Sequence, residues 1–333
     1  MSDEHKDSSL SYDSTFQHFV IDNHMLFGHF HKDDTLSTPP VNWSWSDPCM
    51  MGIDEAGRGP VLGPMVYGSC IAPVSKLADV KSLKFKDSKV LSERERDDLF
   101  EQIRSSEFIS WVVDPIHPQD ISNKMLRMPK ENLNTISHNT AINFVRLYLA
   151  KGYNIQELYV DTVGSPDVYQ KMLKSIFPQI GTIIVASKAD AKYPIVSAAS
   201  ICAKVIRDQQ IHNWTFKEVE RGATVSSETG SGYPGDEVTK KWLRDHMDPV
   251  FGLPDLARFS WSTTVEVMKT RCHPVLWGDE ADEGETGKKA RISNFFTKTK
   301  DEATTSDDLT QRSAIHKKNH MLITTKLSLN ATK

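Results

Sequence analysis

Two short apolar runs in the middle of the chain, ELYVD (157–161) and TIIVAS (182–187), are separated by the helical pattern PDVYQKMLKSIF. Both runs predict buried β-strands. Two strands of one sheet that are joined through a helix lie parallel, with a right-handed crossover. A parallel pair covered by its helix is typical of α/β domains, so this unit sets the fold class.

Three further strands are predicted before this unit. CMMGID (49–54) and MVYGSCIA (65–72) flank a glycine-rich turn, and EFISWVVDP (107–115) follows later. Helices are indicated after Ser92, which has Glu95 in capping-box spacing, then over 131–152, and after Pro194 in a segment rich in small residues. The sequence therefore predicts a mixed five-stranded sheet flanked by helices.

Composition divides the 333 residues into four parts. Residues 1–44 are acidic, serine-rich and poorly periodic, which predicts a disordered tail. The sheet pattern occupies a domain over 45–235, and a helical C-terminal extension is expected over 236–278. Charged and polar residues dominate again over 279–333, which predicts a second disordered tail.

Several classes of protein are disfavoured. Residues 51–278 hold 28 basic and 27 acidic side chains, so any site for a polyanion must be local. The four cysteines form no CxxC pair, which argues against a zinc site or disulfide framework. No run approaches the ~20 apolar residues of a membrane span, so no membrane association is expected. GRGPVLG fails the dinucleotide-binding spacing because residue 62 is Leu.

Acidic residues follow three of the predicted strands, at Asp54, Asp161 and Asp190. Ligands of open α/β sheets collect at the carboxyl ends of strands. Clustered carboxylates repel one another unless a cation lies among them, and hard oxygen donors favour magnesium or manganese. Glu55 can join Asp54 only if the strand has already ended, because successive strand residues point to opposite faces. The alternative is that each acid caps a helix or pairs with a surface lysine.

Five motifs together resemble the type 2 ribonuclease H family over about residues 48–278. They are DEAGRGP (54–60), DSK (87–89), VDTVG (160–164), KADA (188–191) and SAASICAKV (197–205). The resemblance implies a ribonuclease H-like fold. It also implies cleavage of the RNA strand of RNA:DNA hybrids and incision 5′ of single ribonucleotides in duplex DNA, leaving 3′-hydroxyl and 5′-phosphate ends.

By the same resemblance, Asp54, Glu55, Asp161 and Asp190 are catalytic and carry two Mg²⁺ ions, with Mn²⁺ as a substitute. A role in ribonucleotide removal and genome maintenance, and hence a nuclear location, follows from that substrate. The alternative is a catalytically inactive scaffold of the same fold that only binds nucleic acid.

Substrate contacts are expected at three places. The resemblance implies that Gly57, Arg58 and Gly59 grip the 2′-hydroxyl and the neighbouring phosphate through main-chain groups. It also implies that Tyr233 stacks on the deoxyribose after the ribonucleotide. Lys89 is expected at a phosphate, and for Lys204 both phosphate contact and structural pairing remain open.

Partner proteins are also implied. VDTVG and GSGYPGD resemble the eukaryotic form of the family, whose catalytic subunit works with two non-catalytic subunits in a heterotrimer. In the tail, KARISNFF places Ile292, Phe295 and Phe296 at the spacing of a motif that docks on the replication sliding clamp. Lys289 stands where that motif has glutamine, and the alternative is an isolated apolar patch.

Overall fold

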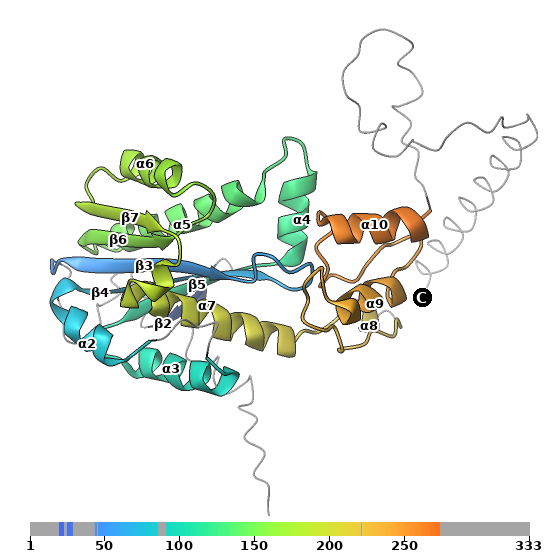
Figure 1. The fold of residues 1–333 in the computed structure, drawn as a ribbon, viewed down its shortest axis with the longest axis horizontal. Helices are drawn as coiled ribbons and strands as arrows, with labels where there is room; N and C mark the ends of the chain where they lie inside the picture. The colour runs from blue at the N-terminus through green and yellow to red at the C-terminus, as the bar shows by residue number, and fades with distance from the viewer. Residues whose placement is uncertain are drawn as a thin grey trace, which may run out of the picture. The chain divides into compact units, whose positions relative to one another are not determined.

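The computed structural model describes residues 20–22, 25–28, 44, 46–85, 91–220 and 222–273, all within one compact unit of the chain. Their strands form one sheet in the order β1-β2-β5-β4-β3-β6-β7 (Figure 1). The five predicted strands are present as β3 (Cys49–Ala56), β4 (Met65–Pro73), β5 (Ser110–Ile116), β6 (Ile155–Asp161) and β7 (Thr182–Ala186). β3 pairs antiparallel with β4 and parallel with β6, and the predicted parallel pairing of β6 with β7 is confirmed.

Two short strands extend the sheet beyond the prediction. β1 (Val20–Asp22) and β2 (Met25–Gly28) form an antiparallel pair, and β2 pairs with β5. The sequence placed both inside the disordered tail over 1–44, so for these residues that prediction is wrong. The two runs, VID and MLFG, are short and lie within a long acidic and polar segment, so the composition of the whole segment concealed them.

Helices cover both faces of the sheet (Figure 1). α5 (Leu133–Ala150) and α6 (Pro166–Ile176) pack on one face, and α3 (Glu93–Ser105) and α7 (Pro194–His212) pack on the other. The predicted capping box is confirmed at the start of α3, where Ser92 and Glu95 bond each other's main-chain N–H. The remaining short helices are η1 (Val74–Lys76), α2 (Leu77–Ser82), α4 (Pro118–Leu126), η2 (Ala189–Ala191), α8 (Lys217–Glu220), α9 (Glu237–Asp245) and α10 (Ser262–Arg271).

α7 lies unusually close to the central strands. A Cβ at Gly52 of β3 would lie 2.5 Å from the main-chain carbonyl of Ile195, and one at Gly68 of β4 would lie 2.4 Å from the carbonyl oxygen of Ala199. Real Cβ atoms do not approach backbone this closely, so only glycine permits the contact. This packing holds the start of α7 against the strand that carries Asp54.

The C-terminal segments pack on the loop that follows β3. A separate apolar cluster joins Val61 and Leu62 of that loop to Trp242 and Leu243 of α9 and to Leu256. Main-chain hydrogen bonds tie the same parts together, from Val61 N to Gly232 O at 2.8 Å and from Gly63 N to Leu256 O at 2.8 Å. The loop is therefore fixed by residues that follow it by about two hundred positions.

Across the described residues, none of the helices combines the length and apolarity that crossing a membrane requires.

Candidate active site

Asp54 lies in the centre of the sheet, and its side chain is buried with 6% of its surface exposed. Burial raises the pKa of its carboxyl well above the ordinary value, and the charges of Glu55 and Asp161 raise it further. A hydrogen bond with Ser200 of α7 acts in the opposite direction. The structure thus brings three predicted acids, Asp54, Glu55 and Asp161, within electrostatic reach of one another.

Glu55 reaches this group in a different way from the one predicted. β3 does not end before it, because Asp54 pairs with Gly68 and Glu55 pairs with Tyr67 in the antiparallel ladder. The prediction that the strand ends at Asp54 is therefore wrong, and the two side chains leave opposite faces of β3. Glu55 lies near Tyr67 and Tyr169, whose pKa values are raised by burial first and by the Glu55 charge second.

Asp161 and Asp190 lie at the ends of neighbouring elements. Oδ1 of Asp161, the last residue of β6, accepts a hydrogen bond of 2.7 Å from the main-chain N–H of Ala189. Asp190 is buried in η2, its Oδ1 accepts from Ala191 N at 3.0 Å, and its carbonyl accepts from Ser197 Oγ. Among the described residues, no three His, Cys, Asp or Glu side chains are arranged to hold one ion.

The turn after β3 is built from main-chain contacts. Gly57 has φ +78°, and a Cβ there would lie 2.0 Å from Nε of the buried Arg207. Arg58 Nη1 donates to Ser137 Oγ at 2.7 Å, and Nη2 donates to Asn134 Oδ1. The Arg58 side chain is thus held by the first turns of α5.

Tyr233 lies beside this turn. Its side chain is half exposed, and ring atom Cε1 lies 3.2 Å from the place of a Cβ on Gly59. The loop that carries Tyr233 is fixed by Asp236, which accepts hydrogen bonds from Ser231 N at 2.6 Å and Ser231 Oγ at 2.8 Å. The predicted main-chain turn and the predicted stacking ring therefore lie side by side.

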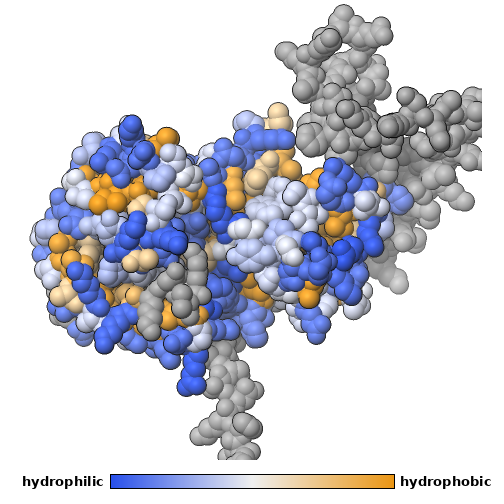
Figure 2. Space-filling model, viewed as in Figure 1, coloured by the Kyte–Doolittle hydropathy of each residue, from blue (hydrophilic) through white to orange (hydrophobic). Residues whose placement is uncertain are grey.

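A cavity of about 460 Å³ opens at the turn. Arg58 and Gly59 line it, together with Met125, Leu133, Ser260, Trp261 and Ser262. Its lining combines the apolar side chains of Met125, Leu133 and Trp261 with the hydroxyls of Ser260 and Ser262 and with Arg58. On the face drawn in Figure 2, apolar side chains form only small separate patches among polar ones.

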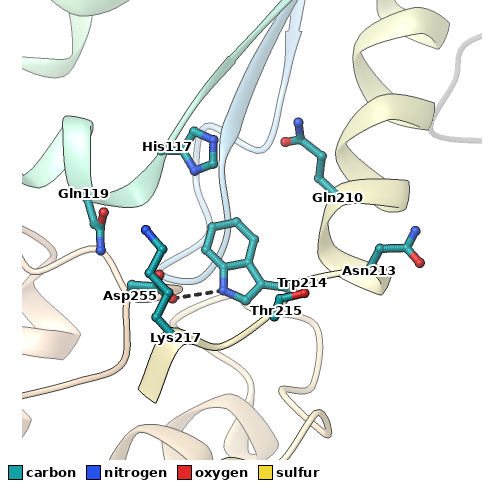
Figure 3. A pocket seen from close by; sticks show the side chains of 8 residues that line it. All are labelled: His117, Gln119, Gln210, Asn213, Trp214, Thr215, Lys217 and Asp255. Carbon is teal, nitrogen blue, oxygen red and sulfur yellow. Dashed lines mark hydrogen bonds between the residues drawn. The ribbon is translucent and has the colours of Figure 1, made fainter. Parts of the chain in front are cut away.

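A second cavity, of about 260 Å³, contains none of the predicted site residues (Figure 3). Its central ring is Trp214, whose Nε1 donates to Asp255 Oδ1 at 3.0 Å. His117 lies over the ring at 5.7 Å between centroids. These contacts join the end of α7 to the segment before Arg258, so the cavity belongs to a structural junction.

Of the two predicted lysines and the predicted tail motif, the structure describes only Lys204. Lys204 Nζ forms an ion pair with Asp208 Oδ1 at 2.6 Å, and Arg96 pairs with the other oxygen of Asp208 at 3.1 Å. Structural pairing is thus present at Lys204, while contact with substrate stays a prediction. Lys89 lies outside the described residues, as do Ile292, Phe295 and Phe296.

Comparison with known proteins decides the family. The model of the ribonuclease HII family matches residues 51–264, a span that contains the four acids, the turn and Tyr233. The chain belongs to the ribonuclease HII family. The predicted resemblance to type 2 ribonuclease H is thereby confirmed, and the members of this family are ribonucleases of the H type.

Similar proteins share most of their length with this chain. The A subunit of ribonuclease H2 from Homo sapiens is 46% identical over 261 residues, which cover 78% of this chain and 86% of that one. The A subunit of ribonuclease H2 from Dictyostelium discoideum is 52% identical over 241 residues, which cover 71% of this chain and 83% of that one.

Solved structures of ribonucleases H have the same fold. Ribonuclease H2 from Pyrococcus horikoshii OT3 is 31% identical with a TM-score of 0.55, covering 67% of this chain and 98% of that one. Ribonuclease HII in the PCNA:RNase HII complex from Archaeoglobus fulgidus is 30% identical with a TM-score of 0.53, and the match covers 66% of this chain and 96% of that one. The predicted fold class, a mixed sheet flanked by helices, is confirmed.

Sequence analysis missed several residues at this ribonuclease HII site. Asn134 and Ser137 bind Arg58, and His138 stacks on Tyr169 at 4.0 Å between ring centroids. The spacing of Asn134 and Ser137, three apart at a helix start, was a usable signal for one polar face. Arg258 and Trp261, which contact the turn from the far end of the chain, gave no local signal.

Proposed function

We propose that this chain hydrolyses the RNA strand of RNA:DNA hybrids and incises 5′ of single ribonucleotides in duplex DNA, leaving 3′-hydroxyl and 5′-phosphate ends. The observation that carries the proposal is the buried Asp54, which lies within electrostatic reach of Asp161 and Glu55 on the strand that leads into the turn beside Tyr233. Membership of the ribonuclease HII family supports the same reaction.

We propose that the acids hold divalent metal, with two Mg²⁺ ions and with Mn²⁺ as a substitute. The chemistry of the donors supports this, because carboxylate oxygens are the ligands Mg²⁺ prefers, and the pKa of Asp54 is raised first by burial and then by the charges of Glu55 and Asp161, which a cation would compensate. Asp54 and Asp161 are the central ligands in this proposal, with Glu55 and Asp190 completing the set. When bound, such ions activate water and stabilise the leaving oxygen of a phosphodiester.

The remaining residues select and orient the substrate. In our proposal the main chain of Gly57, Arg58 and Gly59 binds the 2′-hydroxyl, which is the group that distinguishes RNA from DNA at one nucleotide. Tyr233, half exposed beside Gly59, stacks on the following deoxyribose. Lys89 and Lys204 contact phosphates in the same proposal.

The test is cleavage of a duplex that carries one ribonucleotide, with and without Mg²⁺. Asp54→Asn and Asp161→Asn are each expected to lower turnover by at least about 10³-fold while binding survives, since loss of transition-state stabilisation appears in kcat. Asp167→Asn, at an exposed acid in the first turn of α6, is the matched control and should be active. Full turnover in both site variants would contradict the assignment. Binding without cleavage by the unaltered chain in any metal would instead favour the inactive scaffold.

We also propose that the chain binds partner proteins. The similar eukaryotic proteins are named as A subunits of ribonuclease H2, which supports assembly with two non-catalytic subunits. The structure of the PCNA:RNase HII complex from Archaeoglobus fulgidus supports docking of Ile292, Phe295 and Phe296 on a sliding clamp. Calorimetry of a tail peptide against purified clamp tests this, and a peptide with both phenylalanines changed to alanine is the control. A nuclear location and a role in genome maintenance follow from the proposed substrate.

A further inference from the structure

Arg258 is fully buried, and all its hydrogen bonds go to one loop. Nη2 donates to Gly57 O at 2.6 Å and Nη1 donates to Arg58 O at 3.0 Å. Nε donates to Gly63 O at 2.9 Å. Burying a guanidinium is costly unless its donors are satisfied, and here main-chain carbonyls satisfy them without any carboxylate. The loop therefore supplies the acceptors that keep this cation inside the protein.

Trp261 completes the set of contacts. Its Nε1 donates to Gly59 O at 3.1 Å, and its ring lies 4.7 Å from Cζ of Arg258, which is the geometry of a cation–π contact. The carbonyls of all three residues of the turn are therefore bound by two side chains from the segment 258–261.

These bonds fix where the N–H groups of the turn point. In a planar trans peptide the N–H of one residue points opposite to the carbonyl of the residue before it. Because the carbonyls of Gly57 and Arg58 point to Arg258, the N–H groups of Arg58 and Gly59 point away from it. Both residues line the 460 Å³ cavity, and within the described part of the chain neither N–H donates to a protein acceptor. Two successive free N–H groups form a concave donor site for a hydroxyl or phosphate oxygen.

We propose that Arg258 and Trp261 are positioning residues that set the preference of this nuclease for ribonucleotides, by holding the two N–H groups of the turn toward the substrate. This inference rests on the proposed function, because it assumes that the turn reads the 2′-hydroxyl. Neither side chain needs to touch the substrate for the effect. Their loss lets the peptide planes rotate, so the donors no longer converge on one oxygen.

The experiment compares binding of two duplexes that differ in one 2′-hydroxyl. Dissociation constants are measured for a duplex with a single ribonucleotide and for its all-DNA counterpart, in an Asp161→Asn background that prevents turnover. Arg258→Gln is expected to reduce the ribonucleotide preference by about tenfold, and Trp261→Phe, which keeps the ring but removes the N–H, by about threefold. Arg258→Lys should fall between Arg258→Gln and the parent, since an ammonium keeps the charge but lacks the planar fork.

Trp111→Phe is the matched control, because Trp111 is a buried tryptophan of β5 whose ring packs edge-on against Phe100 of α3 at 5.3 Å between centroids. It should leave the preference unchanged even if stability falls. Simple loss of folded protein lowers binding to both duplexes equally, so a preference unchanged in Trp261→Phe and in folded Arg258→Gln would overturn the inference. Absence of cleavage by the chain with all four acids intact, assayed together with its two proposed non-catalytic subunits, would instead refute the proposed function.

Discussion

The turn after β3 allows a substitution whose cost has two separable parts. Replacing Gly57 by alanine forces a side chain onto a residue with φ +78° and places its Cβ 2.0 Å from Arg207 Nε and 2.7 Å from Pro64 O. Arg207 has little freedom to retreat, because it is buried and its Nε donates to Pro64 O at 3.2 Å. We expect Gly57→Ala to destabilise the protein and to disorganise the turn.

The magnitude follows from the two causes. A left-handed residue with a Cβ costs ~1–2 kcal/mol. Overpacking against a buried side chain and a carbonyl oxygen adds ~1–3 kcal/mol. The sum is about 3 kcal/mol, and at ~2–4 °C of melting temperature per kcal/mol for a domain of this size the expected shift is on the order of 10 °C.

Gly222→Ala is the control that isolates the first cause. Gly222 has φ +86°, and no atom lies within 4 Å of the place of its Cβ. It should lose only ~1–2 kcal/mol, and the effect of alanine on the unfolded chain cancels between the two variants. Urea unfolding measures the free energy of unfolding of both variants. We expect Gly57→Ala to lose about 2 kcal/mol more than Gly222→Ala, because only Gly57→Ala overpacks its surroundings. Equal losses would refute the reasoning that Arg207 and Pro64 leave no room at Gly57.

Three other predictions concern the same region. Hydrogen bonds, chiefly from Ser231, lower the pKa of Asp236 to about 2, so the carboxylate stabilises the fold above pH ~4 and loses that contribution as the pH falls toward 2. Asp236→Asn should therefore be less stable than the parent in urea unfolding at pH 7, with the gap closing near pH 2. Tyr233→Ala should slow cleavage at single ribonucleotides more than cleavage of long hybrids, and an equal loss on both would exclude a role at the junction. Lys204→Gln should change stability by less than ~1 kcal/mol, because its ion pair with Asp208 is partly exposed, and should lower the salt dependence of substrate binding by about one charge. If the salt dependence of substrate binding is unchanged, Lys204 does not contact a phosphate and only pairs with Asp208.

Sequence patterns predicted the elements whose formation depends on residues close together in the chain. The capping box at Ser92 and the apolar run that ends at Asp161 were readable, since each signal lies within a few residues. The end of β3 was not readable, because Glu55 stays in the ladder through its pairing with Tyr67 on another strand. Pairing of β2 with β5 was hidden for the same reason.

The candidate site shows the same limit. The acids were found because each follows an apolar strand, and the family motifs assigned their role. The main chain of Arg58 was expected at the substrate, but nothing in the sequence showed that Ser137 and Asn134, almost eighty residues away, hold its side chain. Arg258 looks like any surface arginine in the sequence, and only its burial against Gly57 and Arg58 shows what it binds.

The dependence of the turn on residues 256–261 also affects the order in which the protein matures. During synthesis from the N-terminus, the sheet and its acids are complete before Arg258 and Trp261 emerge. A partly made chain would possess every proposed metal ligand before the turn after β3 gains the contacts that hold it. In our proposal the preference for one sugar over the other is thus acquired last, because a polypeptide cut short before residue 256 would lack the side chains that bind the carbonyls of the turn.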